Sequence, residues 1–149
     1  MEWLEGLHGT TVGLDTAPLL YFVGRHPRYL ELVRDLFQAV DRGDVAIVTS
    51  TITLTEVLVH PLRQRNVELV RRYRDVLLYS PGLSMLPVSP RVAEEAARLR
   101  ASYGFKTPDA IHLATAILAG GQTFLTNDKR LAKPLSIQVL ILDDLLEGR

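Results

Sequence analysis

The chain has 149 residues, enough for one compact domain with a sizeable core and no need of disulfide or metal cross-links. Apolar residues make up 47% and charged residues 23%, which is typical of a globular protein and argues against a disordered or fibrous chain. Seventeen basic and seventeen acidic side chains cancel, so no bulk charge attracts nucleic acid, and the lack of cysteine excludes disulfides, thiolate metal sites and cysteine nucleophiles.

The absence of cysteine fits a reducing cytoplasm, where we expect the protein to reside. Residues 1–10 lack the basic segment and apolar run of a secretory signal, and no apolar run in the sequence is long enough to span a bilayer. We therefore expect a single domain over residues 1–149, with residues 1–9 as an N-terminal extension and no membrane contact.

Strands and helices are predicted to alternate along the chain. Residues 10–15 form a short apolar strand that ends at Asp15, and residues 16–24 follow as a short helix. The later elements are predicted as helices over 27–41, 51–60, 66–78, 91–103 and 108–119, the last with Thr107 as its N-cap, strands over 45–50, 83–88, 122–126 and 137–142, and a turn into a short helix over 127–131.

This alternation predicts an α/β fold, a mostly parallel sheet flanked by helices on both faces, because parallel strands need crossover connections. In such sheets the functional crevice lies outside the carboxyl ends of the strands. Four acidic residues fall at or just after predicted strand ends or in the helices that follow: Asp15, Glu56, Asp109 and Asp128.

Four carboxylates in one crevice repel one another unless a cation binds them or some are protonated. With oxygen ligands only, Mg²⁺ or Mn²⁺ is favoured over zinc. Such ions polarise phosphoryl oxygens and lower the pKa of bound water, which is the chemistry that phosphodiester hydrolysis needs.

Each carboxylate also has a structural explanation. Thr53 and Glu56 fit a capping box, Asp109 could interact with a helix dipole, and Asp128 could belong to a turn. Asp15 is the hardest to explain in this way, because a carboxylate directly after an apolar strand calls for a partner.

Two further features have alternative interpretations. His112 lies three residues after Asp109 on the same helix and is predicted to be a hydrogen-bonded packing residue rather than a catalytic one. The basic stretch from Arg63 to Arg74 could follow a phosphate backbone, but Glu68 and Asp75 within it favour a solvated helix face equally well.

Four segments, VGLDTAPLLYFV, TSTITLTEVL, KTPDAIHLATAILAGGQTFLTNDKRL and VLIL, resemble the PIN domain family, a metal-dependent nuclease fold that includes the toxins of VapBC toxin-antitoxin pairs. The most specific part is the PDAIHLATA helix with the following TFLTNDKRL turn. In this resemblance the family's acidic positions correspond to Asp15, Glu56, Asp109 and Asp128, and the polar residue of its last turn corresponds to Thr126.

The resemblance implies an endoribonuclease that uses Mg²⁺ or Mn²⁺, cuts single-stranded or looped RNA, is often a homodimer, and is silenced by an antitoxin peptide over the acidic cleft. The four acidic residues would bind metal, with Glu56 closer to a general base, and Thr126 would orient water or a ligand. Lys106, Lys129 and Arg130 flank the cleft in sequence and are candidate phosphate contacts.

The chain departs from the family pattern in two places. About ten extra residues precede the first strand and are expected to add surface only, and Ala17 stands where many relatives carry a small polar residue, which could weaken a contact that supports the metal ligands. Two alternatives stay open: a catalytically idle module that binds RNA or protein through the same cleft, and a receiver-type phosphoacceptor. The second would need an adjacent acidic pair after the first strand, where only Asp15 stands.

Overall fold

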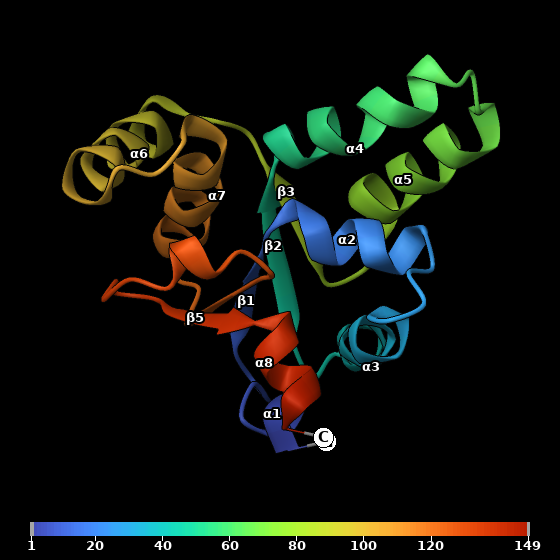
Figure 1. The fold of residues 1–149 in the computed structure, drawn as a ribbon, viewed down its shortest axis with the longest axis horizontal. Helices are drawn as coiled ribbons and strands as arrows, with labels where there is room; N and C mark the ends of the chain where they lie inside the picture. Colours follow the sequence, from blue (N-terminus) through green and yellow to red (C-terminus); the bar gives the residue numbers. More distant parts are fainter. Residues whose placement is uncertain (1, 149) are drawn as a thin grey trace.

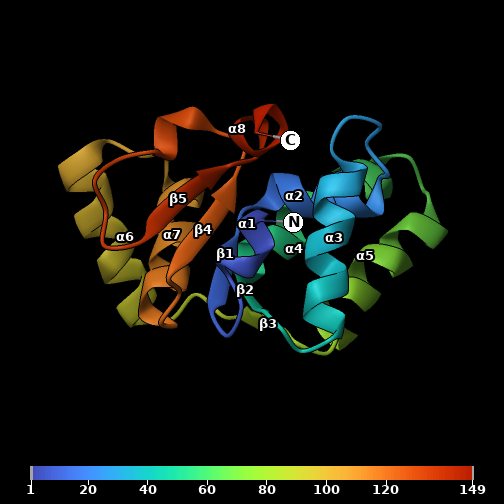
Figure 2. The same cartoon turned by 90° about the horizontal axis from the view of Figure 1, so that it is seen from below.

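The computed structural model describes residues 2–148 and contains one sheet of five parallel strands in the order β3-β2-β1-β4-β5 (Figures 1 and 2). The α/β fold with a parallel sheet is therefore confirmed. The elements are α1 (Glu2–Glu5), β1 (Thr11–Leu14), α2 (Thr16–Val23), α3 (Leu30–Asp41), β2 (Ala46–Ser50), α4 (Thr51–Arg63), α5 (Val67–Tyr79), β3 (Leu83–Leu86), α6 (Pro90–Tyr103), α7 (Thr107–Leu118), β4 (Thr123–Thr126), the 3-10 helix η1 (Lys129–Leu131), β5 (Gln138–Ile141) and α8 (Leu142–Glu147).

Helices cover both faces of the sheet, as predicted. In Figure 1, α6 and α7 lie on one side of the strands, and α2, α3, α4 and α5 lie on the other. Each layer has its own hydrophobic core: Leu14, Leu36 and Leu77 belong to the larger one, and Leu99, Leu113 and Phe124 belong to the one under α6 and α7. The alternation of side chains along each strand supplies both cores, which is why the strands read as continuous apolar runs.

The helix α7 lies unusually close to the central strand β1. A Cβ atom added at Gly13 would lie 2.3 Å from the Cβ of Ala116 and 2.9 Å from Cδ1 of Phe124, so only glycine fits between strand and helix. This contact fixes the height of α7 against the sheet, and with it the position of the acidic residue in its first turn.

The structure differs from the sequence prediction in the packing of the extension, in the start of α7 and in the presence of α8. The extension does not add surface only: Leu7 is buried, and Trp3 and Leu4 pack against the larger core. The helix α7 begins at Thr107, with Lys106 rather than Thr107 as N-cap. The sequence did not predict the helix α8, because α8 follows β5 directly and no loop with a polar N-cap residue marks its start. Within residues 2–148, no helix combines the length and the apolar character needed to cross a bilayer.

Candidate active site

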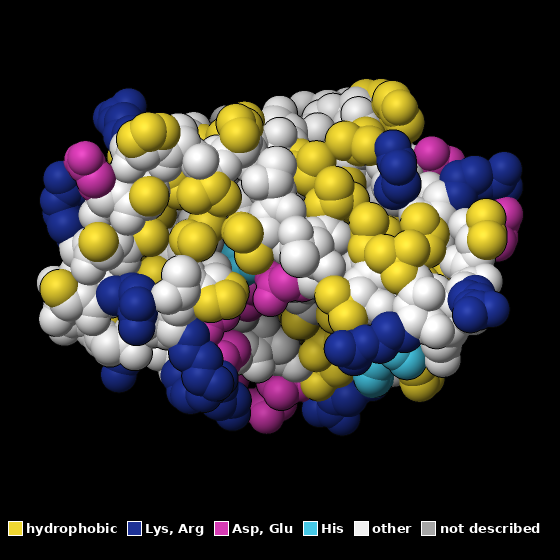
Figure 3. Space-filling view, turned by 90° about the horizontal axis from the view of Figure 1, so that it is seen from above, with side chains coloured by type: hydrophobic (Ala, Val, Ile, Leu, Met, Phe, Trp, Pro, Cys, Tyr) yellow, Lys and Arg dark blue, Asp and Glu magenta, His cyan; other side chains and the backbone are white. Residues whose placement is uncertain are grey.

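The carboxyl ends of the parallel strands meet at one edge of the sheet, and the predicted acidic residues lie there. Figure 3 views the molecule from this side: acidic side chains gather near the middle, between two hydrophobic surfaces, with lysine and arginine side chains beside them. Asp15 follows β1 directly and Asp128 follows β4 by two residues. Asp109 lies in the first turn of α7, and Glu56 lies near the middle of α4.

Asp15 is held from two sides. One carboxylate oxygen, Oδ1, accepts a hydrogen bond of 2.8 Å from the backbone N–H of Thr16, so Asp15 is also the N-cap of α2. The other, Oδ2, accepts one of 2.7 Å from the hydroxyl of Thr126. The same Thr126 oxygen accepts the backbone N–H of Asp128 at 3.1 Å. Thr126 is fully buried and therefore ties the end of β1 to the turn after β4.

Asp109 lies in the first turn of α7, so the helix dipole is its structural explanation. A helix dipole alone would lower the pKa of a carboxyl group in the first turn. Instead, burial raises the pKa of Asp109, and the nearby negative charges of Asp15 and Asp128 raise it further. Three carboxylates therefore share one electrostatic field at the carboxyl edge of the sheet.

Asp128 has a counter-charge of its own. Arg130 donates to both of its carboxylate oxygens, at 3.0 and 3.2 Å from Nε and 2.7 Å from Nη2, and the backbone N–H of Arg130 adds a fourth bond at 3.0 Å. These hydrogen bonds lower the pKa of Asp128. The turn explanation is thus correct for Asp128, which caps η1, but the same side chain also faces the acidic site.

Glu56 belongs to a second group of contacts on the α4 side of the site. Its Oε1 accepts a hydrogen bond of 2.7 Å from the hydroxyl of Thr16 and lies 2.7 Å from Nε2 of His112. The same His112 nitrogen is 4.0 Å from Oδ1 of Asp15. The prediction that His112 is buried and hydrogen-bonded is confirmed, but its partner is a candidate site residue rather than the core.

One tautomer of neutral His112 fits all of the hydrogen-bond distances around its ring. Ser50 accepts the backbone N–H of Ile52 at 3.2 Å, so its hydroxyl proton is free to be donated to Nδ1 of His112, 3.1 Å away. Nδ1 is then the acceptor, and Nε2 carries the proton that is donated to the Glu56 carboxylate. A neutral His112 satisfies every partner in this arrangement.

The capping box at Thr53 and Glu56 is wrong, because Ser50 is the N-cap of α4. Thr53 is instead fully buried, with its hydroxyl 2.8 Å from that of Thr49 and 3.4 Å from that of Thr16. Sequence reasoning missed these hydroxyls as part of the site. The signal was the run TSTITLTE, in which hydroxyl residues continue from a buried strand into the face of the following helix that carries Glu56.

The donor set fits a hard divalent cation. The carboxylates of Asp15, Asp109 and Asp128 supply oxygen ligands, and both causes of the raised pKa of Asp109, burial and the repulsion by Asp15 and Asp128, are ones that a bound cation would offset. Within residues 2–148, no three His, Asp or Glu side chains are already grouped so as to hold an ion. The hydrogen bonds of Asp128 to Arg130, and of Glu56 to Thr16 and His112, account for this, since they draw two of the four carboxylates toward protein partners.

The lowered pKa of Glu56 predicts a pH dependence of stability. The hydrogen bond from His112 is its main cause, so the folded state favours ionised Glu56. This stabilisation is present above the ordinary pKa of 4.5 and is lost as the pH falls through the lower folded value.

We expect the difference in unfolding free energy between wild type and Glu56→Gln to shrink as the pH falls below 4.5. Because the side chain is half-exposed, the change should stay below about 1 kcal/mol. Urea titrations across this range measure it, and a difference independent of pH would contradict the assignment.

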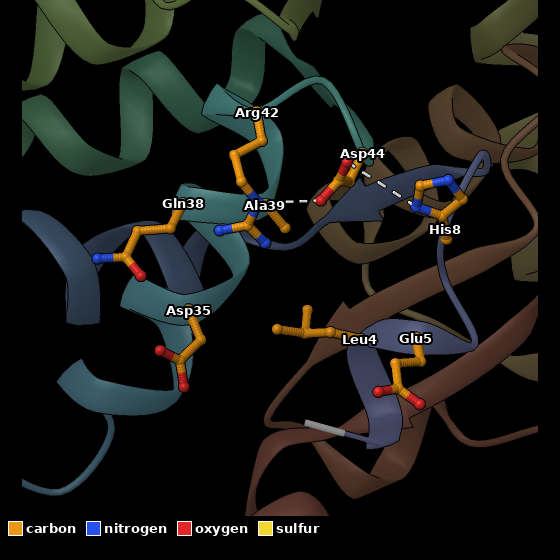
Figure 4. A pocket seen from close by; sticks show the side chains of 8 residues that line it. All are labelled: Leu4, Glu5, His8, Asp35, Gln38, Ala39, Arg42 and Asp44. Carbon is orange, nitrogen blue, oxygen red and sulfur yellow. Dashed lines mark hydrogen bonds and ion pairs between the residues drawn. The ribbon is translucent and has the colours of Figure 1, made fainter.

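Other features lie away from this edge. A cavity of about 550 Å³ opens between α1 and α3, where Arg42 and His8 are both near the carboxylate of Asp44 (Figure 4). It lies beside the amino ends of the strands, opposite the acidic site. In the basic stretch of α5, Arg71 pairs with Glu68 at 2.8 Å, which favours the solvated helix face over a phosphate track.

The sequence matches the family model described as PIN domain over residues 12–134. The N-terminal extension with α1 lies outside this matched region. No curated protein matches the chain.

Several solved structures are similar in fold. A toxin-antitoxin complex from Klebsiella pneumoniae is 26% identical, with a TM-score of 0.66 over 89% of this chain and 98% of the other. VapBC2 from Rickettsia felis, bound to a DNA fragment from its promoter, is 17% identical, with a TM-score of 0.70 over 88% and 98%. VapC20 from Mycobacterium tuberculosis, a toxin that cleaves the sarcin-ricin loop, is 13% identical, with a TM-score of 0.67 over 87% and 99%.

Proposed function

We propose that this chain, which belongs to the PIN domain family, is a divalent-metal-dependent endoribonuclease and the toxin of a type II toxin-antitoxin pair. Members of this family are nucleases, so we take cleavage of a phosphodiester bond as the reaction that the site performs. The observation that carries the proposal is the position of Asp15, Asp109 and Asp128 together at the carboxyl edge of the sheet, where burial raises the pKa of Asp109 and the charges of Asp15 and Asp128 raise it further. Such a cluster is costly unless it serves a cation.

In this proposal Asp15, Asp109 and Asp128 hold Mg²⁺ or Mn²⁺, with Glu56 at the edge of the set. When bound, the ion supplies a polarised phosphoryl oxygen and a water of lowered pKa. Thr126 keeps the Asp15 carboxylate aimed at the site through its 2.7 Å hydrogen bond.

Glu56 is the candidate base that takes the proton of the attacking water. Its Oε1 is engaged by Thr16 and His112, so Oε2 is the atom that can receive the proton. The pKa of Glu56 lies below its ordinary value of 4.5, mainly because of the hydrogen bond with His112, so the side chain is ionised at neutral pH and can accept the proton.

An antitoxin and a second copy of the chain are the proposed protein partners. The complex from Klebsiella pneumoniae contains a toxin and an antitoxin, and it aligns with 89% of this chain. Large apolar side chains are exposed on α4 and α5, which is the surface a partner would cover. The most exposed of them are Leu62, Val67 and Tyr79.

One observation favours a second candidate, an idle module that binds RNA or protein without cutting. Arg130 satisfies the Asp128 carboxylate with three side-chain hydrogen bonds, so an ion must compete with it for this ligand. If the ion loses that competition, the cleft is a binding surface only.

The test is cleavage of a labelled single-stranded RNA by the wild-type chain in Mn²⁺, in Mg²⁺ and in EDTA. We expect cutting that needs the metal and is lost in Asp15→Asn. Asp41→Asn is the matched control, because Asp41 is exposed at the end of α3, next to the amino end of β2. RNA binding without cutting in any metal would favour the idle module, and cutting in EDTA would contradict metal dependence.

A further inference from the structure

A small basic pocket lies directly beside the acidic cluster. Its volume is about 210 Å³, and its wall includes Tyr103, Lys106 and Asp109 on one side and Arg130 and Lys133 on the other. Asp109 is thus shared by the pocket and the acidic cluster. Lys129, which flanks the cleft in sequence, does not line it.

One hydrogen bond joins the two walls of the pocket, and a second fixes the wall formed by the end of α6. The hydroxyl of Tyr103 donates to the backbone carbonyl of Pro134 at 3.2 Å, which ties the end of α6 to the loop between η1 and β5. Arg100 donates from Nε to the carbonyl of Phe105 at 2.9 Å, and Gly104 caps α6 in the left-handed conformation, with φ +72°. The walls of the pocket are therefore held in place by hydrogen bonds within the chain, without a ligand.

The pocket carries cations that the protein does not neutralise. Arg130 is taken up by Asp128, but no carboxylate among residues 2–148 lies within ion-pair distance of Lys106 or Lys133. Lys106 acts on Asp128 through space and helps to lower its pKa, so the pocket cations lie within electrostatic reach of the cluster. Lysine binds phosphate as a point charge, and the guanidinium of Arg130, which could bind a carboxylate or a phosphate through two parallel hydrogen bonds, is already engaged by Asp128.

An aromatic side chain stands beside these lysines. The rings of Tyr103 and Phe105 stack with centroids 5.4 Å apart. Phe105 is buried and Tyr103 is only partly so, which makes Tyr103 the outer ring of the pair. Positive charge beside a partly exposed aromatic ring can bind single-stranded nucleic acid, because phosphates meet the cations and bases stack on the accessible part of the ring.

We propose that this pocket is a nucleotide subsite of the RNA substrate, in which Lys106 and Lys133 contact a phosphate next to the scissile one and Tyr103 stacks on a base. This inference rests on the proposed function and assigns the side of the acidic cluster on which the RNA strand runs.

The test compares three changes in the full chain, using a fluorescein-labelled single-stranded RNA. Cleavage in Mn²⁺ gives KM and kcat, and fluorescence anisotropy in EDTA gives the affinity for uncut RNA. For the Lys106→Ala, Lys133→Ala double variant we expect KM and the dissociation constant to rise about tenfold, with kcat and Mn²⁺ affinity unchanged. The salt dependence of binding should be shallower by about 0.7, because one phosphate is no longer neutralised by the protein. Arg42→Ala is the matched control, because Arg42 is an exposed cation at the opposite, amino edge of the sheet, and it should resemble the wild type.

Tyr103 is tested by a pair of substitutions. Tyr103→Leu removes the ring, whereas Tyr103→Phe keeps the ring and removes only the hydrogen bond to Pro134. We expect Tyr103→Leu alone to weaken RNA binding. Equal losses in both variants would overturn the stacking role in favour of a structural one.

Three other outcomes bear on this inference and on the proposed function. If the wild type cuts RNA and the lysine variant has an unchanged KM and affinity, the subsite is wrong and the nuclease stands. If the wild type neither cuts nor binds RNA, both are overturned. Loss of antitoxin binding with RNA affinity retained would assign the pocket to a protein partner instead.

Discussion

Asp109→Asn should abolish metal-dependent cleavage and at the same time make the protein more stable. The substitution removes one negative charge from the acidic cluster and keeps the shape of the side chain. Loss of a metal ligand costs several kcal/mol of transition-state stabilisation, so activity should fall by at least about 100-fold. Stability should rise because the burial of the charge and its repulsion by Asp15 and Asp128, which together raise the pKa of Asp109, no longer act on a neutral side chain.

The direction of the pH dependence follows from the raised pKa. A carboxyl group whose folded pKa lies above its ordinary value of 3.8 stabilises the fold at low pH and loses that contribution as the pH rises through the folded value. The gain in melting temperature from Asp109→Asn should therefore be present at neutral pH and vanish below pH 3.8. At this chain length each ~1 kcal/mol shifts the midpoint by roughly 2–4 °C.

Added Mn²⁺ separates the metal role from the simple relief of repulsion. A ligand that binds only the folded state stabilises it, by about 2.7 kcal/mol at 100 times its dissociation constant. Mn²⁺ should raise the melting temperature of the wild type and of Asp41→Asn, but not that of Asp109→Asn. An equal rise in all three proteins would mean that Asp109 is not a ligand.

Asp15 should respond differently from Asp109 to the same change. Its carboxylate caps α2 and accepts the hydroxyl of Thr126, so it has native hydrogen bonds to lose. The amide of Asn can accept only one of these two bonds with its oxygen. Asp15→Asn should therefore abolish activity without raising stability, and this contrast between two aspartates of one cluster distinguishes a ligand that is also structural from one that is not.

The α/β fold and the places of all four acidic residues could be predicted from the sequence, because both follow from local patterns. Apolar strands and amphipathic helices alternate, and parallel strands put their carboxyl ends together. Asp15 and Asp128 were found in this way, each just after a short strand. The buried position of Leu7 was not predictable, since one leucine in a short polar extension carries no periodicity.

The hydrogen bonds of the site could not be predicted, because they join residues far apart in the sequence. Thr16 and Glu56 are 40 residues apart, and Glu56 and His112 are 56 apart. Thr53 and Glu56 match the capping-box motif, yet Thr53 is a buried residue within α4, and Ser50 is the N-cap. Local motifs compete with long-range partners, and only packing of α4 against α2 and α7 decides which one forms.

Replacement of His112 should affect stability and catalysis through a single hydrogen-bond network. In His112→Leu the Glu56 carboxylate loses its 2.7 Å partner, and the buried hydroxyl of Ser50 loses its acceptor. We expect a loss of about 2 kcal/mol of unfolding free energy, typical of removing hydrogen bonds to charged and buried groups. Activity should fall by about tenfold or more, because Glu56 is no longer oriented.

The pH profile shows whether the effect runs through Glu56. His112 is the main cause of the lowered pKa of Glu56, so its removal should raise that pKa and move the acid limb of the cleavage rate to higher pH. His112→Gln, whose amide can donate to the same carboxylate, should restore part of the activity. Thr115→Val is the matched control on the same helix, because Thr115 is buried and bonds only to the backbone carbonyl of Ile111. It should keep the wild-type profile. An unshifted acid limb in His112→Leu would make His112 a packing residue whose hydrogen bond to Glu56 has no part in the chemistry.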